Sequence, residues 1–304
     1  MFTEFAIFCM PAPSLLRPPP RLDPESQDAW SQLERLRGEG ERRAAVLALL
    51  LTPGSDRERR AWEEATHGVA ANTQVRGWAR QLPASARLPA LAVLLHPCAA
   101  EPLEARQALL QSLRRMMCAD GQVGALDRLV WLTVRHRLAG PTRPHRGGVR
   151  EHKELEHLPL APRQAIAQFT AYLARMVPGG QPEVEGMLVG AAGTTWYGTV
   201  MRGVWGAEAH PPTCHVPDVD GLGRALQALR ALDWMHRPVL ARFWTDAATT
   251  RPGLLVHANE ALPMAAEALW LACALLDTPL PPALACHFIP VIAAPGQEHE
   301  ARGT

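Results

Sequence analysis

Apolar residues recur at helical spacing along nearly the whole chain after residue 22. Trp30, Leu33 and Leu36 form the first stripe, and an apolar residue at every third or fourth position is typical of a helix with one buried face. Further helices are expected within 101–117, 126–138, 166–176, 222–232, 239–244 and 259–277. No stretch shows the strict alternation that indicates a β-strand. The pattern therefore predicts an all-α protein of about twelve helices.

Turn and capping residues separate the expected helices. The Asp-Pro pair at 23–24 suits an N-cap followed by proline at the first helical position. Ser55 and Glu58 have the spacing of a capping box. We expect the Asp-Gly pair at 120–121 to turn the chain between two helices. Asp127 should then lie near the N-terminus of the second helix, where the helix dipole favours its charge.

The longest central interruption of the apolar pattern lies between Gly140 and Arg150. This segment is rich in proline, glycine and arginine, and such turn-forming residues are typical of a linker. We therefore expect two helical lobes. The predicted organisation is an apolar and proline-rich extension at 1–22, a first lobe at 23–140, a linker at 141–150, a second lobe at 151–290 and a flexible tail at 291–304.

The segment from Met187 to Met201 carries no charged residue and is rich in glycine. Small residues of this kind allow close helix packing, as in many membrane helices. A bilayer span needs roughly 20 apolar residues, and this segment is shorter. Glu185 and Arg202 also bracket it. A closely packed core helix is therefore the favoured interpretation.

The composition fits a folded protein without a dedicated charge preference. Hydrophobic residues make up 47% of the 304 residues, and the formal net charge is +1. Disordered chains combine low hydrophobicity with high net charge, so this chain is expected to fold. Dedicated nucleic-acid binders are usually strongly basic, and nucleic acid is therefore not an expected partner.

The cysteines and the N-terminus bear on the cellular compartment. Six cysteines lie far apart without a CxxC pair, which favours reduced thiols over a disulfide framework. The first ten residues are mostly apolar with Glu4 among them, but they lack a basic region and are followed by prolines, unlike a signal peptide or a membrane span. We expect a cytoplasmic protein, with peripheral association at the inner membrane as the alternative.

Histidines and one cysteine in the central region are the candidates for a metal site. His152 and His157 are five residues apart, whereas the HExxH helix of zinc hydrolases places its two histidines on one face. The chain contains no HExxH, and we expect neither a metal nor a cofactor. A metal-binding enzyme or sensor is kept as an alternative. Its candidate ligands are His145, His152, His157, His210, Cys214 and His215.

Motifs of the common enzyme classes are missing from the sequence. It contains no G-x-S-x-G nucleophile elbow, no Walker loop and no Rossmann glycine pattern behind a strand. No catalytic residue is assigned for this reason, and a non-enzymatic role is favoured.

The one strong charge asymmetry lies between Arg128 and Arg150, where six arginines occur without an acidic residue. Such a stretch can dock phosphates or an anionic membrane surface. Arginine and tryptophan are also favoured at binding hot spots. The residues expected to contact a partner or an anionic surface are Arg135, Arg137, Arg143, Arg146, Arg150, Trp196 and Trp205.

Four phrases between residue 44 and about residue 285 carry a family resemblance. They read AAVLALLLTPGSDRERRAW, LPASARLPALAVLLHPC, LLQSLRRMMCADGQVGALDRLVWLTVRHRL and LPMAAEALWLACALLDTPLPPAL. In this order they resemble the C-terminal cytoplasmic region of HtpX-like zinc-dependent membrane metalloproteases, which have chaperone function. That region is similar to TerB-type helical modules, and its ADG turn and closing LDTPLPP are the most diagnostic elements.

The resemblance implies two TerB-like lobes that act as a detached tail, without the peptidase. The HExxH helix of the family has no counterpart here, so its zinc site maps onto no residue. The second expected ADG turn is replaced by Arg251, Pro252 and Gly253. The implied function is a non-catalytic interaction or regulatory module for a protein partner, with membrane proteins and membrane complexes among the candidates.

A further alternative is a peripheral membrane scaffold. It would use the apolar residues at 1–10 together with the arginine-rich stretch, because basic segments are attracted to anionic lipid headgroups.

Overall fold

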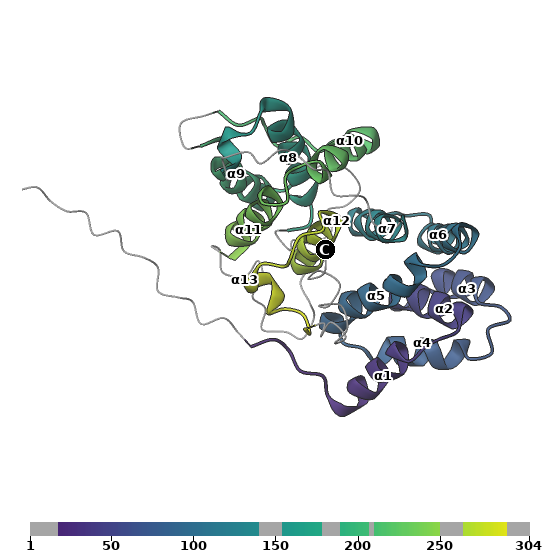
Figure 1. Cartoon of the computed structure of the whole chain (residues 1–304). Helices are drawn as coiled ribbons and strands as arrows, with labels where there is room; N and C mark the ends of the chain where they lie inside the picture. The colour runs from purple at the N-terminus through teal and green to yellow at the C-terminus, as the bar shows by residue number, and fades with distance from the viewer. Residues whose placement is uncertain (1–17, 140–153, 178–188, 207–209, 250–263, 291–304) are drawn as a thin grey trace, which may run out of the picture.

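The computed structural model describes residues 18–139, 154–177, 189–206, 210–249 and 264–290 (Figure 1). These residues form 13 α-helices, 12 of them with seven or more residues, and one short 3-10 helix, and they contain no β-strand. The prediction of an all-α fold with about twelve helices is confirmed. The expected linker at 141–150 lies outside the described residues, so the division into TerB-like lobes stays a prediction.

Seven helices come from the first half of the chain. α2 contacts four of the others, α3, α4, α5 and α6. This central position explains why every residue from Ala44 to Leu49 is buried. The bounds are α1 Pro24–Glu34, α2 Glu39–Leu49, α3 Asp56–Ala65, α4 Asn72–Gln81, α5 Ala84–Ala99, α6 Leu103–Met117 and α7 Ala125–Leu138.

The caps of these helices follow the sequence pattern with one difference. The Asp23 carboxylate accepts a hydrogen bond from the Ser26 backbone N–H, and the Asp127 carboxylate accepts one from the Gly124 N–H at the start of α7. Ser55 caps α3 as expected. The Glu58 carboxylate does not complete a capping box, because it accepts hydrogen bonds from the backbone and hydroxyl of Thr52 instead.

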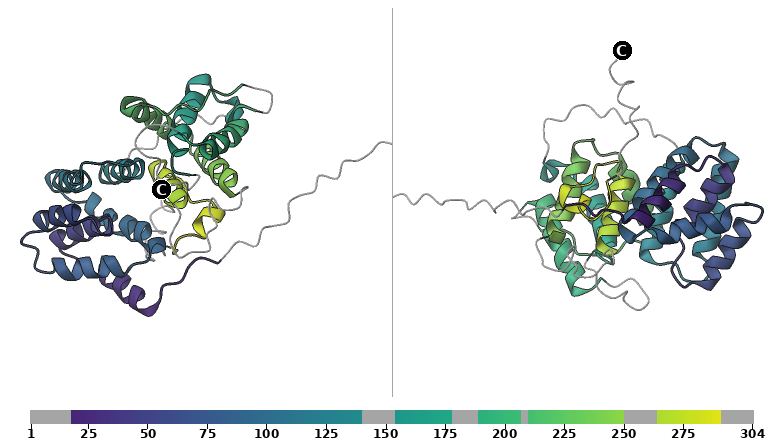
Figure 2. Two further views of the ribbon diagram at one scale, coloured as in Figure 1. Left: turned by 180° about the vertical axis from the view of Figure 1, so that it is seen from behind. Right: turned by 90° about the horizontal axis from the view of Figure 1, so that it is seen from below.

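The second half of the chain contributes a short 3-10 helix and six α-helices. α8 packs against α9 and α10, and α9 packs against α11. Figure 2 shows these helices as a group beside the first seven. The bounds are η1 Leu155–His157, α8 Leu160–Leu173, α9 Ala191–Trp205, α10 Val219–Arg230, α11 His236–Thr249, α12 Met264–Leu275 and α13 Pro282–Ala285.

α12 connects the two groups of helices. It packs against α7 from the first group and against α11 from the second (Figure 1). Ten of its 12 residues are buried, as expected for a helix covered on several sides. A second link comes from Tyr172 on α8, whose hydroxyl donates a hydrogen bond of 2.8 Å to the Ala125 carbonyl at the start of α7.

α9 contains the glycines of the uncharged segment. A Cβ atom at Gly193 would collide with the carbonyl oxygen of Ala174, whereas a Cβ atom at Gly198 would meet nothing within 4 Å. The expected close packing is therefore present at Gly193 and absent at Gly198. None of the described helices combines the length and the apolar character that crossing a bilayer requires.

Candidate binding groove

A groove with a volume of about 620 Å³ lies where α12 and α13 meet α5 and the end of α7. We call it the terminal groove, because its lining extends from residue 19 to residue 290. Most of the lining is apolar, and five of the residues are prolines. The lining residues are Pro19, Pro89, Arg137, Trp270, Ala274, Thr278, Pro279, Leu280, Pro282, Ala285, Cys286, Phe288, Ile289 and Pro290.

The residues after α12 build one wall of the terminal groove. Asp277 has a φ of 48°, and this left-handed conformation turns the chain away from the helix. Aspartate adopts it more readily than most residues. Pro282 then starts α13, at a helical position that requires no N–H donor. The Ile289 N–H donates to the Ser85 carbonyl at 3.2 Å, which ties the wall to α5.

Two aromatic rings support the apolar surface of the groove. The ring centroids of Trp270 and Phe288 lie 6.2 Å apart, and both side chains are buried except at the surface that they offer to the groove. Thr278 adds a hydroxyl and Cys286 adds a thiol to the lining. The lining contains no carboxylate and no imidazole, so its described side chains provide shape and apolar contact rather than an acid–base pair.

Arg137 is the single charged side chain among the described lining residues. Its guanidinium lies 3.5 Å from the Asp277 carboxylate, and the buried His136 contacts the same carboxylate through Nε2 at 3.0 Å. Burial acts to raise the pKa of Asp277, but the His136 hydrogen bond and the neighbouring positive charges outweigh it and hold this pKa below its usual value. Asp277 therefore anchors Arg137 at the rim of the groove.

Arg87 on α5 and Glu267 on α12 are close enough for their charges to influence each other. Arg87 precedes Pro89 of the lining by two residues, and Glu267 precedes Trp270 by three. Burial raises the pKa of Glu267 to about 7, although the positive charge of Arg87 opposes the shift. Burial also lowers the pKa of Arg87. The carboxyl group of Glu267 therefore titrates near neutral pH.

The arginines of the basic stretch are only partly described. Arg135 is exposed and stacks on Trp131, with its guanidinium carbon 5.3 Å from the ring centroid. Arg137 lines the terminal groove. Arg143, Arg146 and Arg150 lie outside the described residues. The structure therefore places one expected contact residue, Arg137, at a hollow in the surface.

The two tryptophans expected at a contact surface pack within the second group of helices. Trp196 is 1% exposed, and its indole N–H donates to the carbonyl of Trp244. Trp205 is half-buried, with the guanidinium of Arg163 at 5.5 Å from its ring centroid. Trp196 is too buried to present a surface to a partner. Neither tryptophan is among the residues that line the terminal groove.

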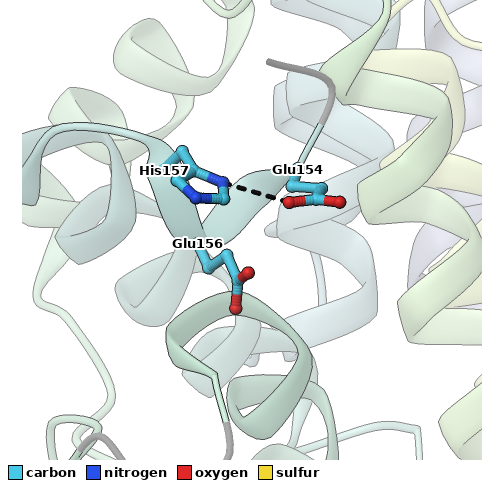
Figure 3. Close-up of side chains that lie close together, drawn as sticks. All are labelled: Glu154, Glu156 and His157. Carbon is cyan, nitrogen blue, oxygen red and sulfur yellow. Dashed lines mark ion pairs between the residues drawn. The ribbon is translucent and has the colours of Figure 1, made fainter.

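One candidate metal ligand, His157, lies beside two glutamates. The potential ligand atoms of Glu154, Glu156 and His157 lie within 4.8 Å of one another, and no other group of three was found in the described part of the chain (Figure 3). His157 Nδ1 is 3.2 Å from a Glu154 oxygen. All three side chains are exposed, and exposed acidic groups of this kind are common without a metal ion.

The other candidate ligands form no such group within the described residues. His210 and His215 are exposed, and Cys214 is half-buried. Burial raises the pKa of the Cys214 thiol to about 11, so forming its thiolate costs more than at an exposed cysteine. His145 and His152 lie outside the described residues.

Sequence reasoning missed most of the terminal groove. Trp270 falls within the helix expected at 259–277 without an assigned contact role, and Phe288 and Ile289 lie outside every expected helix. The available signal was the set of three prolines at 279, 281 and 282, shortly after a helix whose one charged residue is Glu267. Proline fixes its own backbone and donates no hydrogen bond, so such a set predicts an irregular wall rather than another helix.

Comparisons with known proteins return no relative. No protein-family model, no curated protein and no solved structure matches this chain.

Proposed function

We propose that this chain is a non-catalytic helical interaction module whose terminal groove binds an apolar segment of a partner protein that carries an acidic residue. The observation that carries the proposal is the groove itself, with about 620 Å³ of space, a mostly apolar lining and Arg137 at its rim. Binding pockets in proteins have this size and this character, with few polar groups in an apolar surface.

The lining favours binding for two physical reasons. Leu280 and the prolines at 19, 279, 282 and 290 present apolar surface to the groove, over the buried rings of Trp270 and Phe288, and burying such surface against a ligand is the main source of affinity. The prolines hold their backbone nearly rigid, so little conformational entropy is lost when a segment docks on them. The Arg137 guanidinium would then select a segment with a carboxylate at the matching position.

The family resemblance supplies the class of partner. It implies a protein partner, with membrane proteins and membrane complexes among the candidates, for which this module would act as a regulatory subunit. The terminal groove would then hold one segment of that partner. The Glu154, Glu156 and His157 group receives no function here, since it is exposed and its one described ion pair lies within the group.

Selection of ligands from a displayed library of random peptides tests the proposal. Ala285→Trp would fill the groove from α13, and Ala192→Trp adds the same ring on the exposed start of α9 as a matched control. We expect the intact chain to enrich peptides that combine aromatic or aliphatic residues with an acidic one. These peptides should bind the A285W variant at least about tenfold more weakly, and A192W unchanged.

Two results would refute this function. One is a selection that yields no shared apolar and acidic pattern. The other is a set of enriched peptides that bind A285W and the unsubstituted chain equally well, because those peptides would occupy another surface. Circular dichroism of both variants provides the check that their helices are intact.

A further inference from the structure

Both described ends of the chain lie at the terminal groove. Pro19 and Pro290 line it, so the segments 1–17 and 291–304 attach directly at its rim. A tethered segment reaches a nearby site at an effective concentration of about millimolar, far above that of most partners in solution. The groove therefore has two candidate ligands within its own chain.

The N-terminal segment has the chemistry that the groove favours. Phe2, Phe5 and Phe8 are three of the six phenylalanines of the chain, and Glu4 is the one acidic residue before Asp23. The aromatic side chains match the mostly apolar lining of the groove, and Glu4 has the charge opposite to that of Arg137. The eleven residues from Phe8 to Pro19 span up to about 40 Å when extended, which is ample for a return to the groove.

The C-terminal segment is a weaker match. After Val291 and Ile292 it contains no large apolar residue, and Glu298 and Glu300 lie close to its end. Two aliphatic side chains would fill less of the groove than three aromatic ones. The apolar lining thus favours the N-terminal segment as the occupant.

We propose that residues 1–17 of this chain dock into the terminal groove and compete there with the partner segment. This inference rests on the proposed function, since it names the regulation of the same groove. The partner must displace a segment that is always present at high local concentration. The segment therefore raises the partner concentration at which binding occurs. Removal of the aromatic residues of segment 1–17 should leave the groove free for the partner.

Two native cysteines allow the docking to be tested in the intact chain. Cys9 lies within the segment, and the half-buried Cys286 lines the groove. Cys118 is the matched control because it is exposed and precedes α7, whose 14 residues of about 21 Å separate it from the groove end of that helix. Mild oxidation of dilute protein with diamide, followed by peptide mapping, measures which disulfides of Cys9 form.

We expect the Cys9–Cys286 disulfide at a yield at least about tenfold above that of Cys9–Cys118, because tethering in the groove raises the local concentration of one thiol at the other. The triple substitution F2S, F5S and F8S should remove this preference. These residues lie outside the described helices, so the helical signal in circular dichroism reports whether the fold is kept. The same variant should bind a selected peptide at least about tenfold more tightly than the unsubstituted chain.

Three results would overturn the inference. They are equal yields of the two disulfides, the absence of any Cys9 disulfide, and an unchanged preference in the triple variant. Peptide selection that depends on Ala285 can succeed in each of these cases, so the proposed function would stand while the competing segment is rejected. If selection fails but Cys9 pairs with Cys286, the groove binds its own segment without serving a partner.

Discussion

Glu267 and Asp277 belong to the same stretch of chain, yet their surroundings shift their pKa values in opposite directions. Glu267 on α12 is half-buried, and burial disfavours its charged form. Asp277 is more exposed and contacts His136 and Arg137, which favour its charged form. Each shift predicts a pH dependence of the free energy of unfolding with its own sign.

For Glu267, the pKa rises from 4.5 to about 7 in the folded chain. The folded state then holds a proton that the unfolded state releases. The stabilisation from this proton is complete below about pH 4.5 and is lost as the pH rises through about 7. Glu267→Gln keeps the neutral shape, so we expect it to stabilise the chain at pH 8 by up to about 3 kcal/mol relative to wild type.

Urea unfolding at pH 5 and pH 8 measures this effect. The difference between the two pH values should shrink in E267Q. The exposed Glu104→Gln on α6 is the control and should retain the wild-type difference. A pH dependence in E267Q equal to that of wild type would show that the carboxyl group is not protonated in the folded chain.

For Asp277, the pKa lies below its ordinary value of 3.8 in the folded chain, so its charge stabilises the fold above about pH 4 and does so less as the pH falls through the lowered value. Asp277→Asn removes the charge, but asparagine still adopts the left-handed backbone readily. Asp277→Ala removes the charge and also places a residue there that adopts this backbone less readily. We expect both variants to lower the thermal midpoint at pH 7, with alanine less stable than asparagine by about 1 kcal/mol.

Thermal unfolding of the two variants at pH 7 and pH 3 tests this assignment. The deficit of D277N relative to wild type should be smaller at pH 3, where the carboxylate is being protonated. Equal stability of the asparagine and alanine variants would argue against the left-handed turn at the end of α12.

At the scale of single elements, α9 shows that similar glycines have different structural roles. Gly193 lies against the end of α8, and Gly198 lies against open space. The sequence predicts both as small residues in an uncharged helix. The packing of α8 on α9 decides which glycine faces a neighbour. The periodicity of α9 alone does not specify this packing.

Alanine substitution separates the two glycines. Gly193→Ala places a methyl group against the Ala174 carbonyl and should destabilise the chain by about 1–3 kcal/mol, as overpacking does. Gly198→Ala meets no neighbour and should stabilise it by up to about 1 kcal/mol through helix propensity. Urea midpoints of the two variants test the pair, and equal values would contradict the packing of α9 on α8.

Local signals predicted the helices well because they act within a few residues. Asp23, Ser55 and Asp127 cap helices where the sequence places them, since each cap needs only a carboxylate or hydroxyl near an unpaired N–H. Glu58 is the exception. Its carboxylate reaches Thr52 in the preceding turn, and that contact depends on the path of the loop rather than on the spacing from Ser55.

At the scale of the whole molecule, the terminal groove depends on contacts between distant parts of the chain. Pro19, Pro89, Arg137 and Phe288 meet only because α12 packs against α7 and the end of the chain is tied to Ser85. Sequence reasoning selected Arg137 from its charge pattern. It could not predict the apolar residues beside Arg137, because no local pattern records which helices become neighbours.

The central claim is that the groove recognises an apolar segment with Arg137 paired to an acidic residue. The most direct test is a charge exchange, in which the affinity of a selected peptide is measured by calorimetry at low salt. Arg137→Glu should weaken binding at least about tenfold, and lysine in place of the acidic peptide residue should restore most of it. Arg135→Glu, two positions away on α7 and outside the groove lining, should change neither affinity. Equal losses in R135E and R137E, or no recovery with the lysine peptide, would contradict the account.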